Sequence, residues 1–233
     1  MSILDAIIQG IVQGLTEFLP VSSSGHLAIT QHILGAGTGE SNLFFNVMLH
    51  VGTLVAVVAF YHKLVWDLIK EFFLMLKDIF TGKFKWSKMN YNRNLVVMLI
   101  IGLIPLFLLF LPIPGTDMKL KDLADLLSAS PVLIVTACSL ILTSVLLTIG
   151  IIRNRKSVAS THKHLATKSN AKATRDNFNV VDAILVGVTQ VCAALLPGLS
   201  RSGSTLSVGE MRGISKQKAL DYTFVLGIPS ILA

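Results

Sequence analysis

Residues 13–26 read QGLTEFLPVSSSGH, and residues 190–205 read QVCAALLPGLSRSGST. In both, an apolar run ends at a proline, and small hydroxyl residues and glycine follow. The runs are roughly 15 residues long, whereas a helix needs about 20 to cross the hydrocarbon core. Backbone that turns back inside a membrane is tolerated only where protein or a water-filled cavity surrounds it. We therefore expect two re-entrant helical hairpins.

The composition indicates a membrane protein. Hydrophobic residues make up 52% of the 233 residues, charged residues make up 14%, and the mean hydropathy is +0.69. Three apolar stretches, 44–62, 94–112 and 131–152, are each close to the length of a membrane-spanning helix. The fold class predicted from these patterns is an all-α, polytopic membrane protein.

The charges predict the orientation of the spans. Lys and Arg concentrate in the connections 63–93 and 153–175, whereas the connection 113–130 carries Asp117, Asp122 and Asp125. By the positive-inside rule, the first two connections are cytoplasmic and the third is outside. The basic runs flank spans and lack interleaved aromatic residues, which argues against nucleic-acid binding.

The chain contains an internal repeat. Residues 5–20 align with 182–197 without a gap, and after one inserted residue, 21–25 align with 199–203. Three spans separate the copies, so two re-entrant copies would be inverted with respect to each other. If the first copy instead crosses the membrane fully, the same count of spans predicts parallel repeats.

We expect a single membrane domain in three parts. Residues 1–152 hold the first repeat and the following spans, 153–178 form a polar, basic cytoplasmic loop, and 179–233 hold the second repeat. The final stretch, YTFVLGIPSILA, has an apolar run too short to cross a bilayer. We therefore expect the second half to lack its C-terminal spans.

The first repeat carries a carboxylate at predicted membrane depth. On a helix, Gln9, Gln13 and Glu17 share one face. Glutamines alone are more simply explained by hydrogen bonds between helices. An ionisable residue inside a membrane is costly and by default functional, which singles out Glu17. His26 follows across the chain reversal and is a plausible partner for that carboxylate.

The second repeat has Ala194 at the position of Glu17, and it carries Arg201 among small hydroxyl residues. A lone arginine near a span end is often a snorkelling residue. Flanked by Ser200, Ser202 and Thr205, however, it forms a dense donor set for a phosphate-like anion. We expect one shared site, in which Arg201 holds the anion and Glu17 handles water or a metal.

The two stretches resemble the signature motifs of the bacterial undecaprenyl pyrophosphate phosphatases of the bacitracin-resistance type. The resemblance implies a membrane enzyme that removes the terminal phosphate of the C55 lipid pyrophosphate and recycles the lipid carrier for cell-wall synthesis. The resemblance implies two groups of site residues. The catalytic candidates are Glu17, His26, Ser23 and Arg201. The phosphate-binding candidates are Ser22, Ser200, Ser202, Thr205 and, again, Arg201. Gln13 stands where the family has Glu or Gln, so a metal would have fewer protein ligands here.

The sequence is compatible with several alternatives. Glu17 either ligates a divalent ion, Mg²⁺ or Ca²⁺, with Gln13 as a second ligand, or acts as a base. The attacking group is water, Ser23 or His26. Inverted repeats with broken helices also describe secondary transporters, so a carrier or flippase is the competing function. We expect the protein to lie in the bacterial inner membrane and to bind a polyprenyl pyrophosphate. A homodimer is a possible assembly.

Overall fold

The computed structural model describes residues 2–35, 40–86, 89–116, 118–129, 133–165 and 175–232. Within these ranges the chain is helical, and its only β-type pairings are two isolated bridges. This agrees with the all-α prediction. The helices in chain order are α1 (Ile3–Phe18), α2 (Ser23–Ile33), α3 (Glu40–Phe60), α4 (His62–Phe80), α5 (Tyr91–Leu103), the 3₁₀ helix η2 (Ile104–Phe110), α6 (Leu120–Ala129), α7 (Leu133–Leu165), α8 (Val180–Leu195), α9 (Arg201–Met211) and α10 (Lys216–Leu232).

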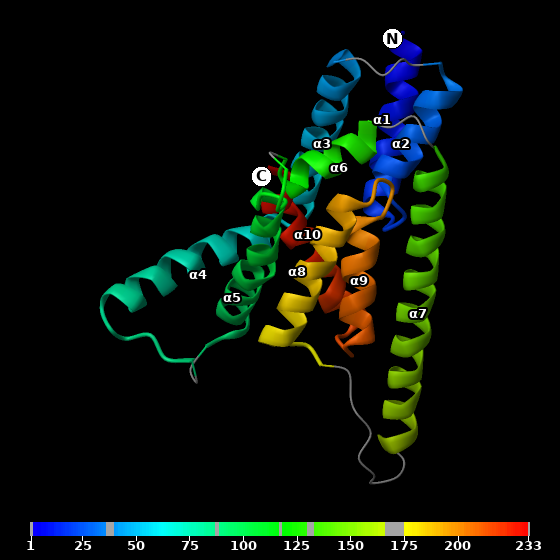
Figure 1. Cartoon of the computed structure of the whole chain (residues 1–233). Coiled ribbons are helices and arrows are strands. Elements are labelled where there is room, and N and C mark those ends of the chain that lie inside the picture. Colours follow the sequence, from blue (N-terminus) through cyan, green and yellow to red (C-terminus); the bar gives the residue numbers. More distant parts are fainter. Residues whose placement is uncertain are drawn as a thin grey trace.

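The repeat in the sequence is also a repeat in the structure. α1 and α8 each contain 16 residues, and α2 and α9 each contain 11. α1 begins at a capping box formed by Ser2 and Asp5, and α8 begins at the equivalent box formed by Asn179 and Asp182. In Figure 1, α1 starts beside the N-terminus at the top, whereas α8 starts at the bottom. The two hairpins are therefore inverted, and their turns meet in the middle.

Two of the three predicted spans are confirmed by length and composition. Residues 91–110, which comprise α5 and η2, and residues 133–155 of α7 form apolar helices of 20 and 23 residues, each with a mean hydropathy of 2.3. The third stretch, 44–62, forms most of α3. α3 qualifies only together with α4, from which it is bent by 83°.

The helix α7 extends into the segment that was predicted to be the central loop. Composition predicted a loop from residue 153, but α7 continues to Leu165. The segment 166–174, which contains most of the remaining predicted loop, lies outside the described residues, as does Asp117. The division into three parts therefore stays a prediction, with a shorter connection than its composition indicated.

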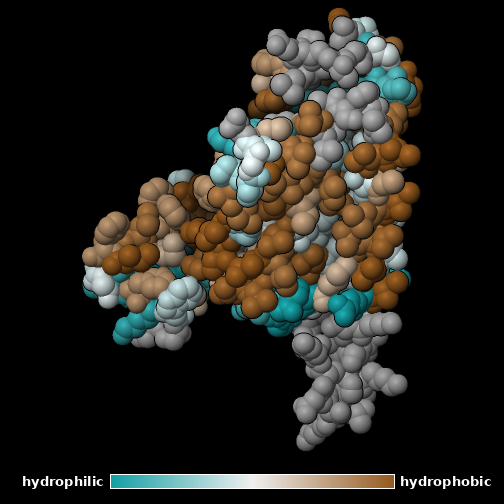
Figure 2. Space-filling view, in the orientation of Figure 1, coloured by the Kyte–Doolittle hydropathy of each residue, from teal (hydrophilic) through white to brown (hydrophobic). Residues whose placement is uncertain are grey.

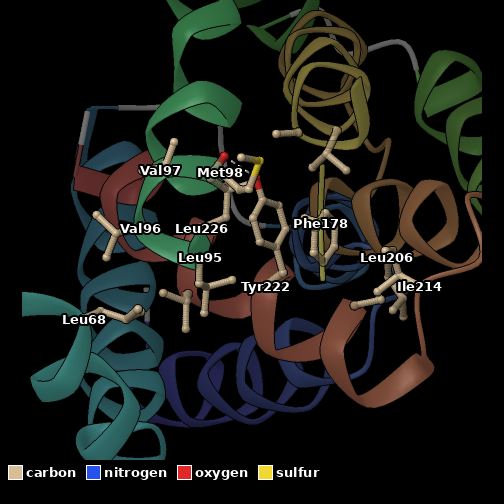
Figure 3. Close-up of a cluster of buried hydrophobic side chains, with 14 of the residues drawn as sticks. Leu68, Leu95, Val96, Val97, Met98, Phe178, Leu206, Ile214, Tyr222 and Leu226 are labelled. Carbon is tan, nitrogen blue, oxygen red and sulfur yellow. Dashed lines mark hydrogen bonds between the residues drawn. The ribbon is translucent and has the colours of Figure 1, made fainter. Parts of the chain in front are cut away.

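A compact core joins the second repeat to the spans. Tyr222 of α10 stacks on Phe178 with ring centroids 4.0 Å apart, and its hydroxyl donates a 2.7 Å hydrogen bond to the carbonyl of Met98 in α5. Figure 3 shows this pair at the centre of the buried cluster. Outside the core, apolar residues cover most of the visible face of the helix bundle, and hydrophilic residues gather along its lower edge (Figure 2). The apolar helices agree with the prediction of a membrane protein.

Candidate functional site

The turns of the two hairpins form the two sides of one site. Ser22 caps α2 by accepting a 3.2 Å hydrogen bond from the Gly25 N–H, and Ser200 caps α9 by accepting a 2.9 Å bond from the Gly203 N–H. These contacts occupy equivalent positions in the two repeats. Both helices therefore begin at the site and direct the positive ends of their dipoles toward it. Such paired N-termini suit an anion.

Glu17 lies between the two turns and contacts both of them. The Ser23 hydroxyl donates a short hydrogen bond to Oε2 of Glu17, and Nε2 of Gln13 donates to the same oxygen at 3.2 Å. The other oxygen, Oε1, lies 3.5 Å from Nη2 of Arg201. Ser23 and Arg201 are the first residues of α2 and α9, and the repeat alignment places them at the same position. One carboxylate thus connects the two repeats.

Arg201 is held from two directions. Besides Glu17, its guanidinium reaches α10, where Nη1 donates a 2.9 Å hydrogen bond to the Ser230 hydroxyl. The arginine side chain is 28% exposed and the glutamate side chain 12%, so the ion pair is largely shielded from solvent. A guanidinium has five N–H donors, and these two contacts leave donors for a phosphate. The arrangement orients a cation toward an anionic ligand.

The site opens into a cavity of about 500 Å³ with two kinds of lining. One side is polar and comes from the two turns, with Glu17, Ser22, Ser23, Ser24, Ser200, Arg201 and Ser202. The other side is apolar and comes mainly from α3 and η2, with Val47, Val51, Leu54, Leu106, Leu109 and Phe110. A cavity with both linings suits a ligand that has an anionic head and a hydrocarbon chain.

Ser22 adopts a backbone conformation that is rare for its residue type. Its φ of 78° is the only positive φ at a non-glycine residue in the described part of the chain. Such a conformation costs on the order of 1–3 kcal/mol and persists where the surroundings enforce it. Here it reverses the chain between α1 and α2, which brings the Ser23 hydroxyl back to Glu17. The strained residue, Ser22, therefore directly precedes Ser23, which makes the contact with Glu17.

Two residues predicted for the site do not line the cavity. Nδ1 of His26 donates a 2.7 Å hydrogen bond to the Ser22 carbonyl, and the residue is not part of the cavity lining. The hydroxyl of Thr205 donates to the Arg201 carbonyl at 2.9 Å and to Thr223 at 3.3 Å. Both side chains therefore support the first turns of α2 and α9. The expected Glu17–His26 partnership is replaced by the contact between Glu17 and Ser23.

The structure also adds residues that the sequence did not single out. His50 of α3, Lys121 of α6 and Gln190 of α8 line the cavity. Gln190 is the repeat equivalent of Gln13, so the alignment of the two copies could have identified it. His50 and Lys121 come from segments without a distinctive motif, and only the packing of helices distant in sequence brings them to the site.

The donor set is a limited fit to a divalent cation. Among the described residues there is no cluster of three or more His, Cys, Asp or Glu side chains that could hold a metal. However, Oε1 of Gln13 is buried without a hydrogen-bond partner in the described structure, and it belongs to the residue that contacts Glu17. A carboxylate and an amide oxygen are ligands that Mg²⁺ and Ca²⁺ accept. The residues present can supply two oxygen ligands.

Comparisons with known proteins identify the family of the chain. The family model described as "Bacitracin resistance protein BacA" matches residues 6–233. A protein of Alkaliphilus metalliredigens named undecaprenyl-diphosphatase is 39% identical over 233 residues, which cover 100% of this chain and 74% of the relative. Relatives with the same name from Methanobrevibacter smithii and Bacteroides thetaiotaomicron are 37% and 35% identical, with 100% of this chain and 74% and 73% of each relative covered. The chain belongs to the BacA bacitracin resistance family.

Proposed function

We propose that this protein is an undecaprenyl-diphosphatase, which hydrolyses undecaprenyl pyrophosphate to undecaprenyl phosphate and inorganic phosphate. The names of its relatives support this activity. The observation that carries the proposal is the placement of Glu17 between Ser23 and Arg201 at the wall of a cavity that is polar on one side and apolar on the other. The site thereby combines a base, a hydroxyl group, a cation and room for an isoprenoid.

The two linings of the cavity bind different parts of the substrate. Arg201, the serine hydroxyls and the N-termini of α2 and α9 bind the pyrophosphate, because each presents N–H or O–H donors to an anion. The apolar side chains of α3 and η2 contact the first isoprene units. This division puts the terminal phosphate next to Glu17 and leaves the rest of the lipid toward the hydrocarbon.

Glu17 accepts a proton as the phosphorus is attacked. The attacking oxygen is the Ser23 hydroxyl or a water beside it, and in both routes its proton passes to the carboxylate. The bond between the terminal phosphorus and the bridging oxygen breaks, and undecaprenyl phosphate leaves. Arg201 stabilises the charge on the phosphoryl oxygens during this step. If Ser23 attacks, water then releases phosphate from the serine.

A divalent ion is part of the proposal. Glu17 and Gln13 would hold Mg²⁺ or Ca²⁺, and the ion would neutralise charge on the phosphates. Gln13 brings no charge, so this site offers one carboxylate where a second would strengthen binding. We expect weak metal binding that becomes stronger when the pyrophosphate adds its own oxygens.

We place the protein in the inner membrane of the cell as a multi-pass protein. The apolar helices α5–η2 and α7 and the basic connections support this location. Its partners are then the bilayer and the polyprenyl pyrophosphate, with no role for nucleic acid.

The test is phosphate release from farnesyl pyrophosphate by the purified protein in detergent, with and without a chelator. We expect release by the wild type, its loss in Glu17→Gln, and a decrease with the chelator that added Mg²⁺ or Ca²⁺ restores. If the folded wild type releases no phosphate but moves a labelled prenyl phosphate across vesicles, the protein is a transporter. Release that the chelator does not change would remove the metal from the proposal and leave the hydrolase.

A further inference from the structure

α4 does not continue the path of α3. The two helices are bent by 83° at Tyr61, and α4 extends to the side of the helix bundle (Figure 1). One side of α4 packs on the protein, where Leu68 and Met75 are buried among residues of the core cluster. The rest of the helix is exposed, although much of it is apolar. A helix of this kind needs a surface that accepts both apolar and charged side chains.

The exposed side of α4 carries two parallel rows of side chains. Trp66, Phe73 and Phe80 recur every seven residues and are 58%, 64% and 87% exposed. The exposed lysines Lys63, Lys70 and Lys77 recur with the same period, each three residues before an aromatic residue. A seven-residue spacing keeps side chains almost in line along a helix, and three residues separate adjacent positions around it. An aromatic row therefore runs beside a cationic row.

The acidic residues of α4 do not neutralise this cationic row. Glu71 and Asp78 both pair with Arg93 of α5, whose Nε lies 3.2 Å from Glu71 Oε2 and whose Nη1 lies 2.7 Å from Asp78 Oδ2. Asp67 lies 3.7 Å from Lys70 in a pair more than half exposed, which is a weak interaction. Lys63 and Lys77 form no ion pair with any of the described residues.

We propose that α4 lies flat in the cytoplasmic boundary of the bilayer and binds anionic phospholipids through Lys63, Lys70 and Lys77. The aromatic row inserts at the boundary of the acyl chains, where tryptophan is favoured, and the lysine row reaches the headgroups. Positive charge beside an inserted apolar face attracts anionic lipids of the cytoplasmic leaflet. In Figure 2 the part of the surface that contains α4 is largely hydrophobic, with hydrophilic residues along its lower edge. The proposal does not depend on the hydrolase activity.

The two tryptophans of the chain provide a direct test. In the Trp86→Phe protein, Trp66 is the only tryptophan, and its fluorescence reports which lipid lies beside α4. The protein is placed in bilayers of phosphatidylcholine and phosphatidylglycerol in equal amounts, with bromine on the acyl chains of only one lipid at a time. Quenching of Trp66 by brominated phosphatidylglycerol should be at least about 1.5-fold stronger than quenching by brominated phosphatidylcholine, because the lysines enrich phosphatidylglycerol around α4.

Variants of the lysine row separate headgroup binding from insertion. In a protein with Lys63→Gln, Lys70→Gln and Lys77→Gln, both lipids should quench equally, whereas the matched triple replacement by arginine should keep the preference for phosphatidylglycerol. Equal quenching by both lipids in the Trp86→Phe protein itself would overturn lipid binding by the lysines. No quenching by either lipid would show that α4 lies outside the bilayer or under another protein, and would overturn the proposal entirely.

Discussion

The hairpins α1–α2 and α8–α9 have equal helix lengths and equivalent caps, but they carry opposite chemistry. The first contributes Glu17, where the second has Ala194; the second contributes Arg201, where the first has Ser23. Because the hairpins are inverted, these different positions meet at one cavity. An inverted duplication thus builds an asymmetric site from two similar halves, one of which carries a carboxylate and the other a guanidinium.

The two hairpins also differ at the end distant from the site. Asp182 is fully buried and pairs with Arg175 at 3.0 Å and Arg212 at 2.7 Å, in addition to capping α8. Its equivalent, Asp5, is a helix cap at the exposed start of α1. The second hairpin is therefore fixed at both ends. We interpret it as the rigid half that holds the cation in place.

The largest effect is expected at Glu17. Glu17→Gln keeps the volume of the side chain and removes the proton acceptor, so phosphate release should fall by about 10²–10⁴-fold. Adding Ala194→Glu should not restore it, because position 194 lies on the second hairpin. Phosphate release and a melting curve in the same detergent check both variants. Near-normal turnover by a folded Glu17→Gln protein would remove Glu17 from the mechanism.

The next largest effect is on stability, and it distinguishes the caps of α8 and α1. Asp182→Asn leaves Arg175 and Arg212 without their buried partner and should lower the free energy of unfolding by about 2 kcal/mol, since both arginines keep some contact with solvent. Asp5→Asn, at the equivalent exposed position, should leave the melting temperature almost unchanged. Thermal unfolding of the two variants side by side measures the difference. Equal shifts would contradict the view that the second hairpin is the more firmly anchored one.

A smaller difference between the two hairpins is expected at the glycines of their turns. A Cβ at Gly203 would collide with the Pro20 carbonyl of the opposite hairpin, whereas a Cβ at Gly25 would lie 3.0 Å from the Leu140 side chain. Backbone cannot move as easily as a leucine side chain. Gly203→Ala should therefore cost about 2 kcal/mol of stability, and Gly25→Ala less than about 1 kcal/mol. If denaturation shows Gly25→Ala to be the less stable variant, the Pro20 carbonyl does not limit the space beside Gly203.

The sequence was sufficient to predict the two hairpins, but it left both an inverted and a parallel arrangement open, and the structure shows the inverted one. The repeated Asp, Gln, Pro and Ser–Gly positions mark both copies, and hydropathy identified α5–η2 and α7 as spans. It was not sufficient to predict the partner of Glu17, because that depends on the positive φ of Ser22, which turns Ser23 rather than His26 toward the carboxylate. The bend at Tyr61 and the approach of His50 to the site likewise depend on tertiary packing.

The central claim is that Glu17 and Arg201 act on the same phosphate from opposite hairpins, and a double-mutant cycle tests it most directly. Phosphate release from farnesyl pyrophosphate is measured for wild type, Glu17→Gln, Arg201→Lys and the double variant, with a melting curve for each. Arg201→Lys keeps the charge but loses the planar fork, so it should slow release more than tenfold, which corresponds to about 1.4 kcal/mol.

Residues that act as a unit have effects that do not add. We therefore predict that the double variant is slower than Glu17→Gln by no more than about threefold. Two results would contradict the account: a double variant whose loss equals the product of the single losses, or an Arg201→Lys protein that is as stable as wild type and within about twofold of its rate.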